Sequence, residues 1–179
     1  MQNEAYDGQV PRVQGVSPLL AALLARRGAT SEAAVRAFLQ PDIADLYDPF
    51  LFSGMEAAVA RIRAAIDGRE RICVYGDYDV DGVCAVSMLY LCLQKLGADV
   101  LYHIPSRHNE GYGMNIDAVE ALAARGVKLI LTVDNGVKAY AEAVRCYELG
   151  MELVITDHHI SGETLPRCAA AVCHTLPGD

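Results

Sequence analysis

The sequence has no apolar run that approaches the roughly 20 residues of a membrane-spanning helix. Residues 1–10 are polar and lack the charged-then-apolar layout of a signal peptide. Internal repeats and low-complexity tracts are also absent, and a hydrophobic content of 53% argues against a disordered chain. These absences predict a globular protein of 179 residues with a real core, no membrane partner and, by default, a cytoplasmic location.

Paired cysteine motifs and excess basic charge are missing as well. None of the six cysteines forms a CxxC pair, which disfavours zinc and disulfide frameworks and predicts small, reduced core residues. The net charge of −8 argues against the broad basic surface that dominates non-specific duplex binding. A nucleic-acid substrate stays open, because bound metal ions would supply positive charge locally and 12 of the 15 basic residues are Arg.

Helical patterns dominate the first part of the chain. Serine N-caps, an early proline and glycine stops mark three short helices, with an extended connection over Pro41–Gly54 before the last of them. The predicted helices begin at Ser17–Pro18, at Thr30–Ser31 and at Met55, and they end at Gly28, before Pro41 and at Gly68.

After Gly68 the pattern changes to short apolar strands that alternate with helices. Repeated β-α units of this length predict an α/β fold with a doubly wound, mainly parallel sheet. The predicted strands are Arg71–Tyr75, Val100–Ile104, Leu129–Val133, Leu153–Thr156 and a last short one over Ala169–Cys173. The predicted helices between them are Val83–Leu96, Ile116–Ala124 and Lys138–Leu149.

Carboxylates and imidazoles follow three of these strands, at the edge where parallel sheets bind ligands. They are Asp77, Asp79 and Asp81 after the first strand, Asp134 after the third, and Asp157, His158 and His159 after the fourth. Such groups can hold two divalent cations close together, and a cation pair favours in-line attack on a phosphorus centre.

The Asp77–Gly82 segment also resembles a calcium loop or a solvated turn. An EF-hand calcium loop needs a glutamate at its twelfth position, but the twelfth residue from Asp77 is Met88 and a strand precedes the segment. A solvated turn stays open, although three carboxylates crowded at one strand end repel one another unless cations hold them.

The remaining candidates have alternatives of their own. Asp134 suits a ligand that bridges two metals, but an Asp-Asn-Gly turn that caps the next helix accounts for it equally well. The His158–His159 pair favours a site where one imidazole binds metal and the other faces a substrate phosphate, whereas a lone histidine is usually structural. Arg107 lies in a glycine-bearing loop at the same edge, either as a phosphate contact or as a solvated surface residue.

Four strings taken together resemble one known family. They are VYGDYDVDG over Val74–Gly82, NEGYG over Asn109–Gly113, VDNG over Val133–Gly136 and TDHH over Thr156–His159. This combination is similar to the DHH phosphoesterase superfamily and, within it, to the RecJ-type single-strand-specific exonucleases. The resemblance covers almost the whole chain, including the helical leader up to Met55, which small nucleotide-hydrolysing relatives generally lack.

The resemblance implies a phosphodiesterase that uses two divalent cations, Mn²⁺ or Mg²⁺, to degrade single-stranded DNA from its 5′ end in recombination and repair. Besides the DNA, a helicase and a single-strand-binding protein are the expected partners. The implied metal ligands are Asp77, Asp79, Asp81, Asp134 and His158, with Asp77 a ligand or its close neighbour. The implied catalytic residues are His159, which stabilises the phosphoryl transition state, and Asp157, which supports the histidine pair. The candidate substrate contacts are Arg107, Gly111 and Tyr112.

The chain also departs from the family pattern. Some members carry a metal-binding histidine where this chain has Tyr75, so one metal site is expected to be filled differently or to bind its ion more weakly. A further metal-ligating aspartate, a second cleft domain and a nucleic-acid-binding β-barrel are expected downstream in the family. We therefore expect a helical leader over residues 1–54 and a DHH domain over residues 55–179 that is incomplete at its C-terminal end and weak or inactive alone.

Two alternative functions differ in class. A DHH phosphoesterase for short oligonucleotides or cyclic dinucleotides is one, and the helical leader argues against it. A non-catalytic DHH-fold scaffold of a repair assembly is the other, and the acidic and histidine cluster argues against it, because a scaffold needs no metal ligands.

Overall fold

The computed structural model describes residues 10–107 and 111–175 of the chain. Asn109 and Glu110, which contribute to the family resemblance, lie outside the described residues. The chain divides into two compact units between Asp48 and Pro49, and the leader boundary at residue 54 stays a prediction.

Between residues 10 and 48, the described part of the first unit, the structure has helices α1 (Pro18–Ala25) and α2 (Glu32–Leu39) and the 3₁₀ turn η1 (Ile43–Asp45). The predicted serine caps are confirmed, because the hydroxyls of Ser17 and Ser31 accept from the backbone amides that begin α1 and α2. Val35 of α2 is fully buried in a small core, whereas Phe38 of the same helix is 58% exposed.

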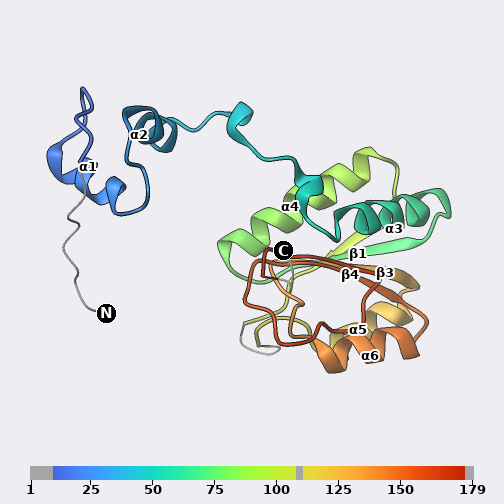
Figure 1. Ribbon diagram of the computed structural model, residues 1–179. Coiled ribbons are helices and arrows are strands. Elements are labelled where there is room, and N and C mark those ends of the chain that lie inside the picture. The colour runs from blue at the N-terminus through green and yellow to red at the C-terminus, as the bar shows by residue number, and fades with distance from the viewer. Residues whose placement is uncertain (1–9, 108–110, 176–179) are drawn as a thin grey trace. The chain divides into compact units, whose positions relative to one another are not determined.

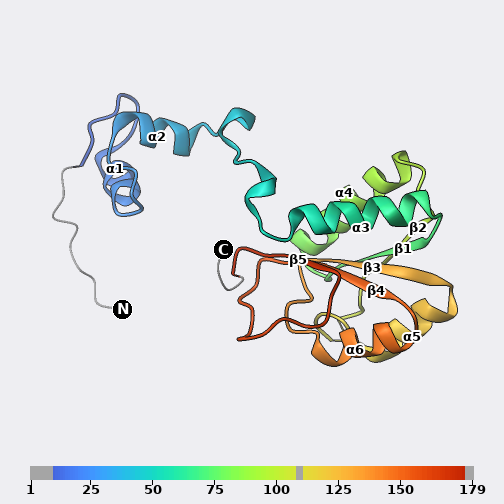
Figure 2. The same ribbon diagram turned by 45° about the vertical axis from the view of Figure 1, so that its right-hand side comes forward.

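The second unit is a five-stranded parallel sheet in the order β2-β1-β3-β4-β5. Its strands are β1 (Arg71–Tyr75), β2 (Val100–His103), β3 (Val127–Val133), β4 (Glu152–Thr156) and β5 (Ala170–Val172). Its helices are η2 (Pro49–Leu51), α3 (Met55–Asp67), α4 (Val80–Lys95), α5 (Ile116–Ala124) and α6 (Tyr140–Glu148). Helices α3 and α4 cover one face of the sheet and α5 and α6 the other (Figures 1 and 2). The predicted doubly wound α/β fold is confirmed.

Alternate residues of the strands supply two separate cores. In β1, Ile72 and Val74 join the core beneath α3 and α4, while Cys73 and Tyr75 join the core beneath α5 and α6. All four side chains are fully buried, as expected for a strand in the middle of a parallel sheet. The carboxyl ends of the strands are therefore held at a fixed edge.

Two predictions about local structure beside the sheet need correction. Helix α4 begins at Val80 and not at Val83, because the Asp79 carboxylate caps it by accepting from the Gly82 amide at 3.1 Å. Asp81 thus lies in the first turn of α4, where the helix dipole favours a negative charge. The connection predicted as extended over Pro41–Gly54 instead contains the 3₁₀ turns η1 and η2.

The cysteine prediction is correct in part. Cys73, Cys146 and Cys173 are buried, whereas Cys84 and Cys92 are exposed on α4 and are not core residues. Within the described part of the chain, no helix has both the length and the apolar character required to cross a membrane.

Candidate metal centre and active site

The three predicted clusters meet at the carboxyl edge of the sheet. Asp77, Asp79 and Asp134 form one group whose ligand atoms lie within 4.8 Å of one another, and Asp134, His158 and His159 form a second such group. Asp134 belongs to both groups. A carboxylate shared in this way can bridge two cations, the role for which the sequence marked it.

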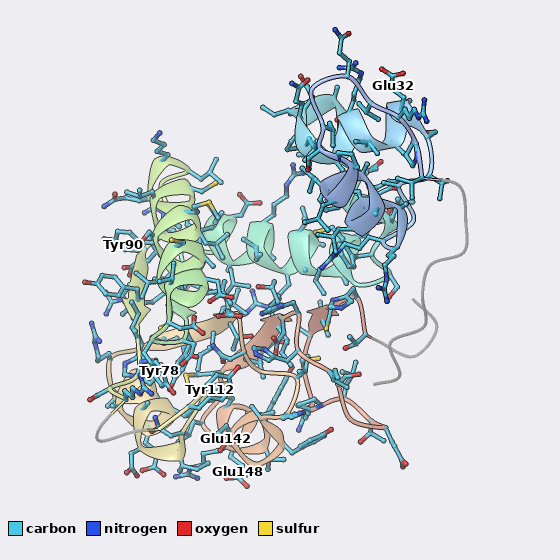
Figure 3. The ribbon with its side chains drawn as sticks, turned by 90° about the vertical axis from the view of Figure 1, so that its left-hand side faces the viewer. Glu32, Tyr78, Tyr90, Tyr112, Glu142 and Glu148 are labelled. Carbon is cyan, nitrogen blue, oxygen red and sulfur yellow. The ribbon has the colours of Figure 1, made fainter. Side chains whose placement is uncertain are left out.

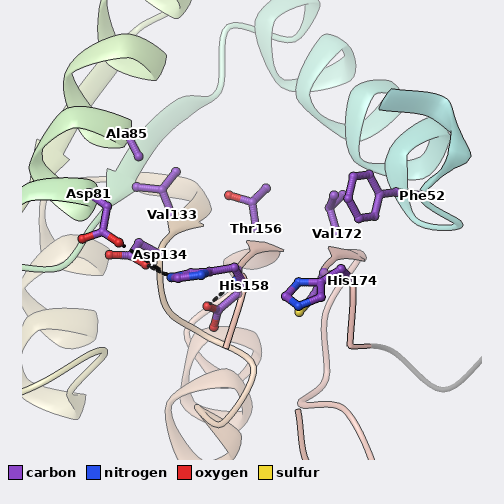
Figure 4. Close-up of a pocket in the computed structure, with 11 residues that line it drawn as sticks. Phe52, Asp81, Ala85, Val133, Asp134, Thr156, His158, Val172 and His174 are labelled. Atoms are coloured by element: carbon purple, nitrogen blue, oxygen red, sulfur yellow. Dashed lines mark hydrogen bonds and ion pairs between the residues drawn. The ribbon is translucent and has the colours of Figure 1, made fainter. Parts of the chain in front are cut away.

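His158 connects the strand-end clusters directly. Its Nε2 lies 2.8 Å from Oδ1 of Asp134 and 3.8 Å from Oδ2 of Asp81 (Figure 4). Asp81 is outside both ligand groups, and its side chain is 65% exposed. It faces the centre from α4, while His158 faces it from the end of β4.

The carboxylates of Asp77 and Asp134 are buried and have few hydrogen-bond partners among the described residues. Asp77 is fully buried, and neither of its oxygens makes a well-formed hydrogen bond with a described residue. Burial raises the pKa of Asp77, and the charge of Asp79 raises it further. Burial, together with Asp81 and Asp79, likewise raises the pKa of Asp134, and the contact with His158 opposes this shift. This donor set of oxygens and imidazole fits divalent cations, which would satisfy the buried oxygens.

The backbone at Asp134 is held in an unusual conformation. Its φ of 61° lies in the left-handed region, which Asp adopts more readily than most residues. The buried Asn135 side chain donates to the Val133 carbonyl at 2.9 Å and to the Tyr75 carbonyl at 3.4 Å, which ties the turn to β1. Strained backbone of this kind concentrates at functional sites.

Asp157 orients the second histidine. Burial opposes its ionisation, but the amides of Val137, His158 and His159 and the His159 ring outweigh burial and lower the pKa of Asp157. An ionised Asp157 only accepts, so His159 Nδ1, at 2.7 Å, carries the proton in this contact. His159 Nε2 then faces the Tyr112 hydroxyl at 2.9 Å.

The predicted substrate residues Arg107, Gly111 and Tyr112 belong to the segment between β2 and α5, and Tyr112 lies beside His159. Burial raises the pKa of Tyr112, and the surrounding aspartates raise it further, so its hydroxyl stays protonated and can donate. The exposed Arg107 has its guanidinium carbon 5.5 Å from the centre of the Tyr78 ring. Gly111 has a φ of 79°, so the glycine permits the turn that leads to Tyr112.

Tyr75, where some family members place a histidine, faces away from the acidic cluster. Its hydroxyl donates to the Gly113 carbonyl at 3.2 Å and accepts from the Asn115 side chain at 3.2 Å. The Tyr75 side chain therefore anchors the loop that carries Tyr112, and it does not replace the metal-binding histidine of those family members.

The metal centre opens into a cavity of about 440 Å³, the size of a small-ligand pocket. Asp81 and Asp134 line one side of it, His158 lies between, and Phe52 and His174 line the other (Figure 4). Sequence reasoning assigned no role to Phe52 or His174. The position of His174 just after β5, at the same edge as the other site residues, was the available signal.

Comparison with known families now identifies the fold. The model of the DHH family, N-terminal domain, matches residues 71–178. The chain belongs to the DHH family. The matched residues include every aspartate and histidine of the candidate centre.

Among named DHH proteins, the chain is similar to RecJ exonucleases. It is 46% identical over 163 residues to the single-stranded-DNA-specific exonuclease RecJ of Bacillus subtilis, which covers 91% of this chain and 21% of the relative. Identity to the Escherichia coli RecJ is 35% over 156 residues, covering 87% of this chain and 26% of the relative. The chain thus spans about a fifth to a quarter of the length of these relatives.

Solved DHH structures agree with this likeness. A crystal structure of exonuclease RecJ bound to manganese matches with a TM-score of 0.69 and 36% identity, covering 75% of this chain and 34% of that one. RecJ from Thermus thermophilus in complex with Mn²⁺ matches with a TM-score of 0.68 and 31% identity, covering 94% of this chain and 25% of that one.

Proposed function

We propose that this chain is the metal-binding part of a phosphodiesterase that degrades single-stranded DNA from its 5′ end in recombination and repair, with two Mn²⁺ or Mg²⁺ ions as cofactors. The observation that carries the proposal is Asp134, which is shared by two ligand groups and has a buried carboxylate. Support for the substrate comes from the relatives, which are named single-stranded-DNA-specific exonucleases.

The proposed ligands are Asp77, Asp79, Asp81, Asp134 and His158. Divalent cations bound there would act as Lewis acids that neutralise negative charge on the phosphate oxygens during in-line displacement. The buried carboxylates would place that positive charge in a site where little water screens it.

The neighbouring residues would act on the substrate. Asp157 holds the His159 ring through Nδ1, so the Nε2 edge is directed toward the side of the centre where Tyr112 lies. The protonated Tyr112 hydroxyl would donate to a phosphate oxygen, and His159 would donate from Nε2 when its ring carries a proton on both nitrogens. Arg107 would bind a phosphate of the strand through its fork of N–H groups. Gly111 would let the backbone of the loop approach the strand.

The same function implies partners and a location. A nuclease restricted to single strands depends on a helicase to open duplexes and meets strands that a single-strand-binding protein covers. Both are proposed partners, and the cytoplasm is the proposed location because the chromosome of bacterial relatives lies there.

Manganese titration by calorimetry tests the centre in the chain itself. We expect the wild-type chain to bind Mn²⁺, and Asp79→Ala and His158→Ala to bind it more weakly. Equal heats for all three proteins would contradict the metal centre. Ser87→Ala, on the exposed face of α4, is the matched control for a substitution near the site.

A nuclease assay with Mn²⁺ tests the substrate. We expect 5′-phosphorylated single strands to be cut in preference to duplexes and to dinucleotides. A preference for dinucleotides would favour the small-substrate phosphoesterase instead. Because the chain alone is expected to be weak or inactive, a scaffold is favoured only if a longer chain that continues into the expected downstream aspartate also binds Mn²⁺ and cleaves none of the three.

A further inference from the structure

Tyr78 lies where no functional residue was expected, between the proposed ligands Asp77 and Asp79. Its ring is half-buried, and the guanidinium of Arg107 lies over it at 5.5 Å. The Tyr78 ring also meets the Tyr112 ring edge to face, with centroids 6.4 Å apart and an interplanar angle of 85°. Figure 3 shows the two labelled tyrosines side by side. Tyr78 therefore contacts both predicted substrate side chains.

The contact continues to the metal centre. The Tyr112 and His159 rings lie 5.6 Å apart, and the His159 and His158 rings lie 4.6 Å apart. A continuous row of planar groups thus connects the exposed Arg107 to the proposed metal ligand His158. Tyr78 is the member of this row that contacts Arg107.

We propose that Tyr78 is a positioning residue that holds the Arg107 guanidinium beside the metal centre for a phosphate of the bound DNA strand. The inference rests on the proposed function, which supplies the strand. It assigns to Tyr78 no contact with the reacting atoms.

The chemistry of stacking supports this role. A cation–π contact uses the flat face of the guanidinium, so the N–H groups in its plane can still bind a phosphate bidentately. An exposed arginine otherwise samples many rotamers and loses that freedom on binding. If Tyr78 already restricts the Arg107 side chain before DNA binds, less conformational entropy is lost on binding. The affinity for the strand then rises without a new contact to the DNA.

A purely local role for Tyr78 predicts different behaviour. If the ring only shaped the turn between β1 and α4, its loss would disturb Asp77 and Asp79 and would weaken Mn²⁺ binding. If it acts through Arg107, its loss would weaken DNA binding alone, and only while Arg107 is present.

The test compares Tyr78→Phe, which keeps the ring, with Tyr78→Leu, each with and without Arg107→Ala. Binding of a 3′-fluorescein-labelled, 5′-phosphorylated oligothymidylate is measured by anisotropy, with Ca²⁺ in place of Mn²⁺ to suppress cleavage. We expect Tyr78→Leu to weaken binding about two- to fivefold. We expect Tyr78→Phe to restore it, and Tyr78→Leu to add nothing to Arg107→Ala.

A second measurement needs no DNA. The ring current of Tyr78 should shift the Nε–H resonance of Arg107 upfield in the wild-type chain and in Tyr78→Phe, and the shift should vanish in Tyr78→Leu. Manganese affinity should be the same in all of these variants.

Three outcomes would overturn the positioning role. They are an unchanged Arg107 resonance in Tyr78→Leu, an equal loss of binding in Tyr78→Phe, and a further loss when Tyr78→Leu is added to Arg107→Ala. A wild-type chain that does not bind the oligonucleotide would instead contradict the proposed function, and the Arg107 resonance would then decide the positioning role alone.

Discussion

Charged side chains are paired at the amino end of the parallel sheet, whereas like charges are crowded together at its carboxyl end. At the amino end, Arg61 pairs with both Glu70 and Glu152, and Arg71 pairs with Asp99 at 2.9 Å. At the carboxyl end, the carboxylates crowd together, and burial raises the pKa of Asp77 and Asp134. The amino end therefore pairs its charges, while the carboxyl end keeps a repulsive cluster that bound cations would relieve.

Backbone packing, rather than charge pairing, holds the acidic end together. Gly82 lies so close to Asp77 that an added Cβ would come within 2.6 Å of the Asp77 carbonyl oxygen. The Thr156 hydroxyl donates to the Thr132 carbonyl at 2.7 Å across the ends of β4 and β3. The carboxylates can thus be placed close together although their charges repel.

The largest effect is expected from removing the shared charge. Asp134→Asn keeps the shape of the side chain, and Asn tolerates the positive φ at this position. We expect Mn²⁺ affinity to fall by more than the roughly 10- to 100-fold typical of losing a supporting partner, because both ligand groups lose a member. Calorimetric titration measures this fall.

The same variant should stabilise the metal-free chain. Its thermal midpoint without metal is expected to rise, because a charge that burial and two aspartates disfavour is gone. Added Mn²⁺ should raise the midpoint of the wild-type chain more than that of the variant. A lower midpoint in metal-free Asp134→Asn would contradict the repulsive character of the acidic end.

Gly82→Ala tests the backbone packing at this end. Helix propensity alone predicts a gain of about 0.5–1 kcal/mol, since Gly82 lies within α4. The added Cβ, however, would meet the carbonyl oxygen, amide nitrogen and carbonyl carbon of Asp77 at 2.6, 2.8 and 2.9 Å, and backbone cannot swing aside as a side chain can. We expect a net loss of about 1–3 kcal/mol in the free energy of unfolding, measured in urea.

The matched control for Gly82→Ala is Cys84→Ala, at an exposed position of the same helix. It should leave the free energy of unfolding nearly unchanged. Stabilisation by Gly82→Ala would show that the turn can move away from α4 without strain.

Local patterns in the sequence were enough to predict the parallel sheet and the cluster at its carboxyl edge. Strand ends carry their own residues to that edge, so Asp134 and His158 could be brought together without knowledge of the strand order. The start of α4 was missed, because the capping by Asp79 competes with its proposed role as a ligand and both use the same carboxylate. Tyr78 was missed because its proposed role depends on a contact with Arg107 across the fold, which no spacing in the sequence encodes.

The smallest effect is expected at the amino end. The Arg61 side chain is 16% exposed and holds the middle of α3 to β4 through Glu152. Arg61→Met keeps much of the apolar stem but leaves two partly exposed glutamates without their partner. We expect a loss of about 1–2 kcal/mol in the free energy of unfolding, with Mn²⁺ affinity unchanged. Arg145→Met is the matched control, since Arg145 also pairs with two glutamates, but its side chain is 35% exposed, so solvent screens the pairs more and the loss should be smaller. If Arg61→Met weakened Mn²⁺ binding as much as it weakened the fold, the two ends of the sheet would be coupled, and the division between a stabilising end and a metal-binding end would fail.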